Sequence, residues 1–220
     1  LANKNAVKIA PNDPSAHNNL GITLRDSGRL KEAEESLRMA INLKPNYAEA
    51  YNNLGITIKD QEECVKYFRK AIVINPKYAG AYNNLGITLR NLGRLKEAEY
   101  NTKKAIELNP NFVEACNNLG LILTDLEKFE EAKIFLQKAI DFKDDFAEAY
   151  NNLGIVLNEA LKLDEAEKNF KKAIVLKSNF TEAKNNLGNL LKDIGKNDEA
   201  EKNFREVIVL RPDFAEAYNN

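Results

Sequence analysis

The stretch Asn18-Asn19-Leu20-Gly21 recurs five more times along the 220-residue chain. Every copy keeps the order Asn-Asn-Leu-Gly, and the final glycines are residues 21, 55, 86, 120, 154 and 188. Successive glycines are 34 residues apart, except for one step of 31 residues from Gly55 to Gly86. A fixed period of this length is typical of an array of stacked repeats and not of one globular core.

Each repeat contains two segments with the spacing of amphipathic helices. In the first complete repeat, residues 15–26 and 30–44 carry apolar or small side chains at intervals of three and four, and Ser27-Gly28-Arg29 separates them. Pro45 then ends the second segment. This pattern predicts an antiparallel pair of helices joined by a tight glycine turn.

Polar residues before the first helices predict where those helices start. An Asn or Asp followed three residues later by Glu is typical of a capping box, in which each side chain accepts from a backbone N–H of the first turn. Five repeats carry the pattern, at Asn46 and Glu49, Asn111 and Glu114, Asp145 and Glu148, Asn179 and Glu182, and Asp213 and Glu216.

The order of bulky and small residues in the repeat is also regular. In the first complete repeat these residues are His17, Leu20, Gly21, Leu24, Ala33, Leu37, Ala40 and Pro45. With this order the chain resembles the tetratricopeptide repeat (TPR) family from end to end. The resemblance implies an all-α fold, a right-handed superhelical solenoid of antiparallel helix pairs. The small residues let paired helices approach closely, and the large residues fill the space around them.

The glycine spacing divides the chain into a single array over residues 1–220. We expect residues 1–13 to be a partial repeat with a second helix only, and residues 215–220 to start a further repeat. The complete repeats are 14–47, 48–78, 79–112, 113–146, 147–180 and 181–214. Because the chain starts and stops in mid-repeat, we expect a segment of a longer protein whose ends are prone to end-to-end or homodimeric association.

The second complete repeat is three residues short. Asp60-Gln61-Glu62-Glu63-Cys64 replaces the longer turn of the other repeats, so we expect the repeat spacing to deviate there. Cys64 stands where Ala33 stands in the first complete repeat, which predicts a small packing residue and not a reactive thiol.

The paired asparagines fall on the side of the first helix opposite its packing residues. At about 100° per residue, both asparagines share this side with the residues three and six positions after the second asparagine. In a TPR superhelix this side lines the concave groove. The predicted peptide-binding surface therefore comprises Asn18, Asn19, Ile22, Arg25, Asn52, Asn53, Ile56, Lys59, Asn83, Asn84, Ile87, Arg90, Asn117, Asn118, Leu121, Asn151, Asn152, Ile155, Asn185 and Asn186.

A carboxamide offers both a donor and an acceptor, so repeated asparagines can pair with the backbone of an extended peptide. The aliphatic row beside them can take up apolar side chains. The array is most similar to the asparagine-lined TPR region of O-linked N-acetylglucosamine transferases, which holds substrate polypeptide. The alternative interpretation is that the asparagines bond within the scaffold and form a solvated face.

Composition excludes several classes of function. With 32 Lys and Arg against 33 Asp and Glu, the chain has no overall attraction for nucleic acid or an anionic membrane. Its single histidine, His17, lies at a packing position, and its two cysteines are far apart, so we expect no catalytic residues, no metal site and no cofactor. Free cysteines favour a reducing compartment, the cytoplasm.

Three functions remain open from the sequence. The first is a scaffold that binds a protein or peptide partner in its groove and is not itself an enzyme. The second is a substrate-recruiting region of a larger enzyme, such as a glycosyltransferase. The third is a structural repeat that self-assembles.

Overall fold

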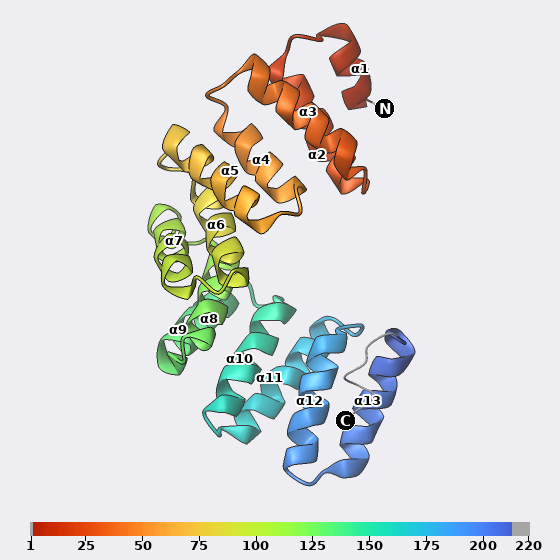
Figure 1. Ribbon diagram of the computed structural model, residues 1–220. Coiled ribbons are helices and arrows are strands. Elements are labelled where there is room, and N and C mark those ends of the chain that lie inside the picture. Colours follow the sequence, from red (N-terminus) through yellow and green to blue (C-terminus); the bar gives the residue numbers. More distant parts are fainter. Residues whose placement is uncertain (1, 213–220) are drawn as a thin grey trace. The chain divides into compact units, whose positions relative to one another are not determined.

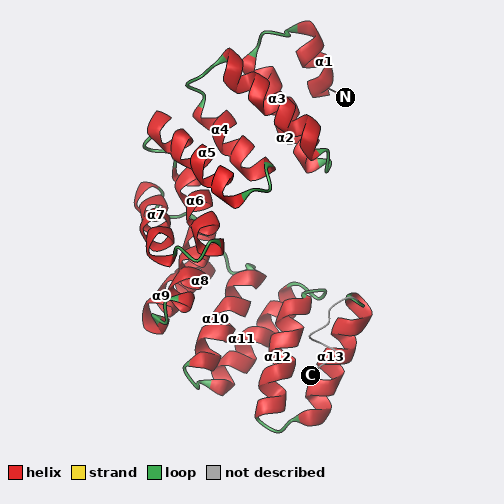
Figure 2. Ribbon diagram, in the orientation of Figure 1, coloured by secondary structure: helices red, strands yellow, loops and turns green. Residues whose placement is uncertain are grey.

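The computed structural model describes residues 2–212, and these residues contain helices and connecting turns but no strand (Figures 1 and 2). The helices are α1 (Ala2–Ile9), α2 (Pro14–Asp26), α3 (Leu30–Leu43), α4 (Ala48–Thr57), α5 (Gln61–Ile74), α6 (Ala79–Asn91), α7 (Leu95–Leu108), α8 (Val113–Asp125), α9 (Phe129–Phe142), α10 (Ala147–Glu159), α11 (Leu163–Leu176), α12 (Thr181–Asp193) and α13 (Asn197–Leu210). The predicted further repeat at 215–220 lies outside the described residues.

The chain forms two compact units, Leu1–Pro110 and Asn111–Asn220. In the first unit, α2 pairs with α3, α4 with α5 and α6 with α7, and each pair packs on the next. In the second unit, α8 pairs with α9, α10 with α11 and α12 with α13, again in sequence order. This arrangement confirms the predicted all-α array of helix pairs. One such pair lies in each of the six repeats that the glycine spacing delimits.

The Leu-Gly dipeptide sets the distance between the two helices of a repeat. Gly154 of α10 and Phe170 of α11 are both buried, and a Cβ atom added to Gly154 would lie 2.6 Å from Cε1 of Phe170. Four other glycines face a large side chain in the same way: Gly21 with Leu37, Gly55 with Phe68, Gly120 with Leu136, and Gly188 with Phe204. Glycine is therefore needed because a large core residue of the paired helix occupies the space of its side chain.

The third complete repeat departs from this packing. Thr102 of α7 takes the place of the large residue opposite Gly86 and is fully buried. Within residues 2–212, its Oγ1 atom is the one buried side-chain nitrogen or oxygen without a hydrogen-bond partner. An unpaired buried hydroxyl destabilises its surroundings, so this repeat has a weaker core than its neighbours.

The predicted capping boxes are wrong for Asn46, Asn111, Asp145 and Asn179. The N-cap residues are instead the aromatics that follow them, Tyr47, Phe112, Phe146 and Phe180, and none makes a side-chain cap bond. Two of the glutamates form ion pairs with basic side chains instead. Glu148 accepts from Lys177 at 2.8 Å, and Glu182 accepts from Arg211 at 3.0 Å. The box predicted at Asp213 lies outside the described residues.

Ion pairs also connect successive repeats. Glu167 of α11 accepts from Lys171 of its own helix at 2.5 Å and from Lys196, which precedes α13, at 3.0 Å. These two bonds hold the pKa of the Glu167 carboxyl below its usual range. The carboxylate is therefore ionised at neutral pH and contributes to the packing of the last repeat on its neighbour.

The turn between the helices of a repeat requires a left-handed residue. Gly28, Gly93 and Gly195 take this conformation, with φ between 72° and 78°. In two repeats the same position holds Glu127 (φ 58°) and Leu161 (φ 56°). Leu161 is also 82% exposed, so its side chain gains little from burial while its backbone is strained.

Leu161→Gly is expected to raise the free energy of unfolding by about 1 kcal/mol, because the left-handed strain of a non-glycine residue exceeds the entropy that glycine loses. Urea unfolding followed by circular dichroism measures the change. The opposite kind of change, Gly28→Ala, should lower the free energy of unfolding by a similar amount. An added Cβ there meets no atom within 4 Å, so the substitution adds only backbone strain. A Leu161→Gly variant that is less stable than the original chain would contradict this account.

Candidate functional site

The first asparagine of each pair is buried, although the sequence predicts that it is part of the peptide-binding surface. Their exposed fractions are 4–6%. The buried residues are Asn18, Asn52, Asn83, Asn117, Asn151 and Asn185. A polar amide at such depth needs hydrogen-bond partners within the protein.

For four of these asparagines, a partner comes from the neighbouring repeat. The Nδ2 atom of Asn53 donates to Oδ1 of Asn18 at 2.9 Å, and this bond joins α4 to α2. The same bond recurs from Asn84 to Asn52 at 2.9 Å, from Asn152 to Asn117 at 2.9 Å, and from Asn186 to Asn151 at 3.0 Å. We call this series the asparagine ladder. The ladder fixes one repeat on the next, as the alternative interpretation of the sequence anticipated.

The second asparagine of each pair keeps part of its hydrogen-bonding capacity. A carboxamide has two N–H donors and two acceptor positions. In Asn53, Asn84, Asn152 and Asn186, the ladder uses one of the donors. Asn19 is exposed, Asn152 is buried, and Asn53, Asn84, Asn118 and Asn186 are half-buried. Some amide groups therefore remain accessible to a ligand. Their number is smaller than the two per repeat that the sequence predicts.

The aliphatic row lies next to the second asparagines on the first helices. Ile56 of α4 is 45% exposed. The other members are half-buried, and they are Ile22 and Ile87 in the first unit, and Leu121 and Ile155 in the second. In the first unit we define the first-helix surface as Asn19, Ile22, Asn53, Ile56, Asn84 and Ile87.

The predicted basic row is not continuous along the helices. Arg25 donates to Asp26 at 2.9 Å and is thereby neutralised. Lys59 lies beyond the end of α4, which corrects its predicted position on that helix. The short repeat has lost the last turn of its first helix, so only Arg25 and Arg90 stand on helices.

The two cysteines and the single histidine lie at least partly within the fold. Burial raises the pKa of the Cys64 and Cys116 thiols, so both are protonated at neutral pH and are poor nucleophiles. His17 is half-buried, and its Nε2 atom lies 2.8 Å from the carbonyl oxygen of Pro11.

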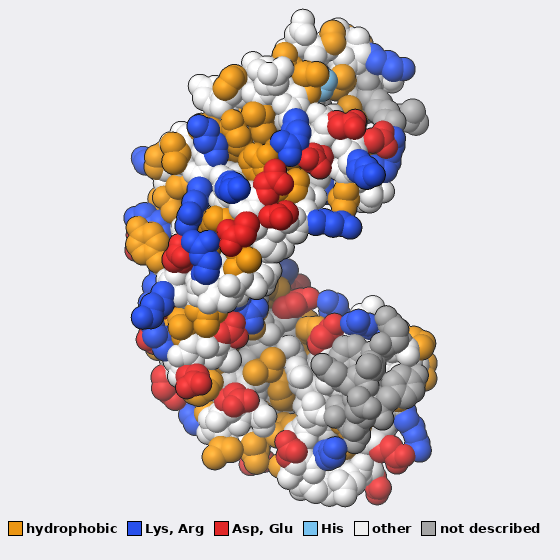
Figure 3. Space-filling model, in the orientation of Figure 1, with side chains coloured by type: hydrophobic (Ala, Val, Ile, Leu, Met, Phe, Trp, Pro, Cys, Tyr) orange, Lys and Arg blue, Asp and Glu red, His pale blue; other side chains and the backbone are white. Residues whose placement is uncertain are grey.

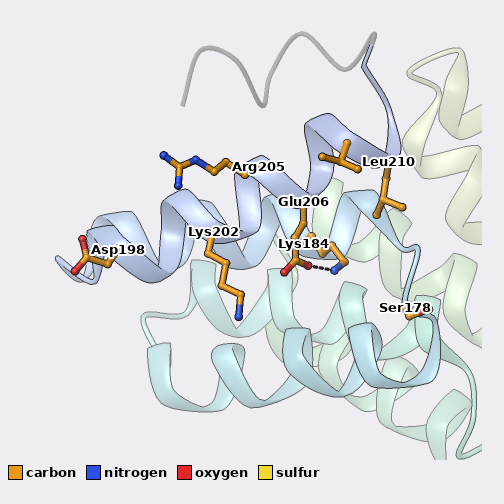
Figure 4. A pocket seen from close by; sticks show the side chains of 8 residues that line it. Ser178, Lys184, Asp198, Lys202, Arg205, Glu206 and Leu210 are labelled. Carbon is orange, nitrogen blue, oxygen red and sulfur yellow. Dashed lines mark hydrogen bonds and ion pairs between the residues drawn. The ribbon is translucent and has the colours of Figure 1, made fainter.

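A hollow of about 420 Å³ in the second unit contains a buried charge (Figure 4). Lys184 of α12 is 8% exposed, and its ammonium forms an ion pair with Glu206 of α13. Lysine stands here where Tyr51, Tyr82 and Tyr150 stand in other repeats. The charge is therefore balanced within the scaffold.

On the face in view in Figure 3, positively and negatively charged side chains are interspersed.

The chain matches models of the tetratricopeptide repeat over most of its length. The matched residues are 3–35, 23–62, 48–78, 79–112, 113–146 and 181–211. No significant match was found among curated proteins. Across residues 2–212, no helix is long and apolar enough to cross a bilayer.

Solved structures share the fold at low sequence identity. The chain matches a structure of the APC/C hetero-tetramer Cut9-Hcn1 with a TM-score of 0.90 and 15% identity, over 99% of this chain and 44% of that chain. It thus spans less than half of that protein. PilF of Pseudomonas aeruginosa matches with a TM-score of 0.79 and 21% identity, over 94% and 95% of the two chains.

A third structure, YrrB, is described as a TPR protein with an unusual peptide-binding site. It matches with a TM-score of 0.62 and 23% identity, over 84% of this chain and 97% of that chain. The repeat matches, the helix pairs and the glycine-to-core packing lead to the same conclusion: the chain belongs to the tetratricopeptide repeat family.

Proposed function

We propose that the chain is a scaffold that binds a polypeptide segment on its first-helix surface. The observation that carries this proposal is the row of incompletely buried aliphatic side chains, Ile22, Ile56 and Ile87, on consecutive first helices of one unit. The scaffold gains little from leaving these side chains partly exposed, and such rows typically contact another molecule. A peptide-binding site in YrrB, which has the same fold, agrees with this function.

The asparagines have a smaller role in this proposal than the aliphatic row. Asn53 and Asn84 each direct one N–H to the ladder, which leaves one donor and the carbonyl oxygen for a ligand backbone. Asn52 is buried and accepts from Asn84, so its replacement alters stability as well as binding. Tests of binding should therefore target the isoleucines.

Ile56→Glu combined with Ile87→Glu is expected to weaken the capture of polypeptide partners at least about tenfold, because two carboxylates would be desolvated against an apolar ligand. The measurement compares partners retained from cell extract by the immobilised original and variant chains. A matched control is Val73→Glu, since Val73 is an aliphatic residue of the same unit and is 72% exposed on a second helix. Equal losses in both variants, or no loss in either, would contradict the proposal.

A further inference from the structure

A hollow lies beside the short repeat, where its first helix ends early. Helix α4 has 10 residues, whereas α2 and α6 have 13. The chain leaves α4 at Thr57, and Ile58 is extended with φ −80° and ψ 159°. The hollow, of about 510 Å³, lies between this linker and the start of α3 in the preceding repeat.

The floor and rim of this hollow combine apolar and cationic groups. Leu30 and Ile58 line it and are half-buried. Lys31 and Lys59 line it from the two repeats and are exposed. In the part of the chain that the structure describes, neither lysine forms an ion pair or a hydrogen bond through its side chain.

The acidic groups of the hollow are already engaged. Arg38 donates to Glu34 at 2.8 Å and lies 3.3 Å from Oε1 of Glu63. The hydroxyl of Tyr67 also donates to Glu63 at 3.0 Å. Asp60 is the N-cap of α5, where its carboxylate accepts from the backbone N–H of Glu63 at 2.8 Å.

This division of charge selects the kind of ligand. Because the acids have partners within the scaffold, the two lysine ammonium groups remain available to an external carboxylate. The apolar floor can accept an aliphatic side chain next to that carboxylate. A nucleic acid has no such side chain, so an acidic polypeptide fits this lining better.

We propose that this hollow binds an acidic and aliphatic segment of a polypeptide, with a Glu or Asp side chain between Lys31 and Lys59 and an aliphatic side chain against Leu30 and Ile58. The site is separate from the first-helix surface. The extended linker that follows α4 supplies two of its residues, Ile58 and Lys59.

The test uses a fluorescein-labelled peptide of alternating leucine and glutamate, with fluorescence anisotropy as the readout. The original chain is expected to bind this peptide at least about tenfold more tightly than a counterpart in which glutamine replaces every glutamate. Lys31→Gln combined with Lys59→Gln should remove this preference. Both lysines are exposed, so the variant should fold normally, and circular dichroism checks this.

Two variants serve as controls. Lys96→Gln changes an exposed lysine at the position of Lys31 in the third complete repeat, and should leave peptide affinity unchanged. Val73→Glu alters an exposed aliphatic residue of α5 that belongs to neither proposed binding surface, and it should also leave peptide affinity unchanged. Equal binding of the two peptides, or an undiminished preference for the glutamate peptide in the double-lysine variant, would overturn the proposal.

Discussion

Gly154→Ala should lower the free energy of unfolding by about 2 kcal/mol, although alanine is the better helix former by about 1 kcal/mol. The new methyl group would lie 2.6 Å from Cε1 and 2.7 Å from Cδ1 of Phe170, closer than van der Waals contact allows. Phe170 is itself almost fully buried, so its ring cannot move aside without disturbing the core. Urea unfolding followed by circular dichroism measures the loss.

A double-mutant cycle shows whether the ring is the cause. Phe170→Ala alone is expected to cost about 4 kcal/mol, as the removal of a buried aromatic side chain typically does. Without the ring, Gly154→Ala should be neutral or stabilising, because only its helix propensity remains. If Gly154→Ala were equally harmful with and without the Phe170 ring, the close approach of the two helices would not explain the glycine.

Gly80→Ala provides the matched control for helix propensity. Gly80 lies in the first turn of α6, and the atoms nearest to an added Cβ would belong to the Tyr78 ring, with the closest at 3.1 Å. The same substitution is therefore expected to change stability by less than about 1 kcal/mol. The contrast between Gly80 and Gly154 isolates the contribution of the buried partner.

The packing of the repeats could be predicted from the sequence because it depends on residue size. The Leu-Gly spacing identified the glycines of the helix pairs, and the 31-residue step identified the short repeat. The left-handed conformation of Glu127 and Leu161 could also have been predicted, since both residues occupy the repeat position of Gly28. The relation to asparagine-lined glycosyltransferase repeats stays a prediction, because no comparison tests it.

The depth of the asparagines could not be predicted from one helix. A helical projection places Asn52 opposite the packing residues of its own pair, but it contains no information on the adjacent first helix. Packing against that helix buries Asn52 and brings its Oδ1 within 2.9 Å of Asn84. The cap at Asp60, in contrast, could have been predicted, since Asp60 and Glu63 have the capping-box spacing.

Replacement of one first asparagine should separate two repeats while leaving each helix pair intact. Asn151→Ala is expected to lower the free energy of unfolding by about 2 kcal/mol, since it removes the acceptor of Asn186 and leaves a cavity at a site that is 5% exposed. In a repeat array, stability is the sum of the repeats and of their interfaces. The loss should therefore concentrate in α12 and α13, beyond the broken interface.

Amide hydrogen exchange measures this pattern, with faster exchange expected in α12 and α13 than in α8 and α9 of the same unit. Asn189→Ala is the matched control, because Asn189 lies half-buried on α12 outside the asparagine ladder. A uniform loss of protection in α8 and α9 as well would show that the second unit unfolds as a whole. An unchanged stability for Asn151→Ala would mean that the ladder does not hold the repeats together, and the asparagines would then regain their place as candidate ligand-binding residues.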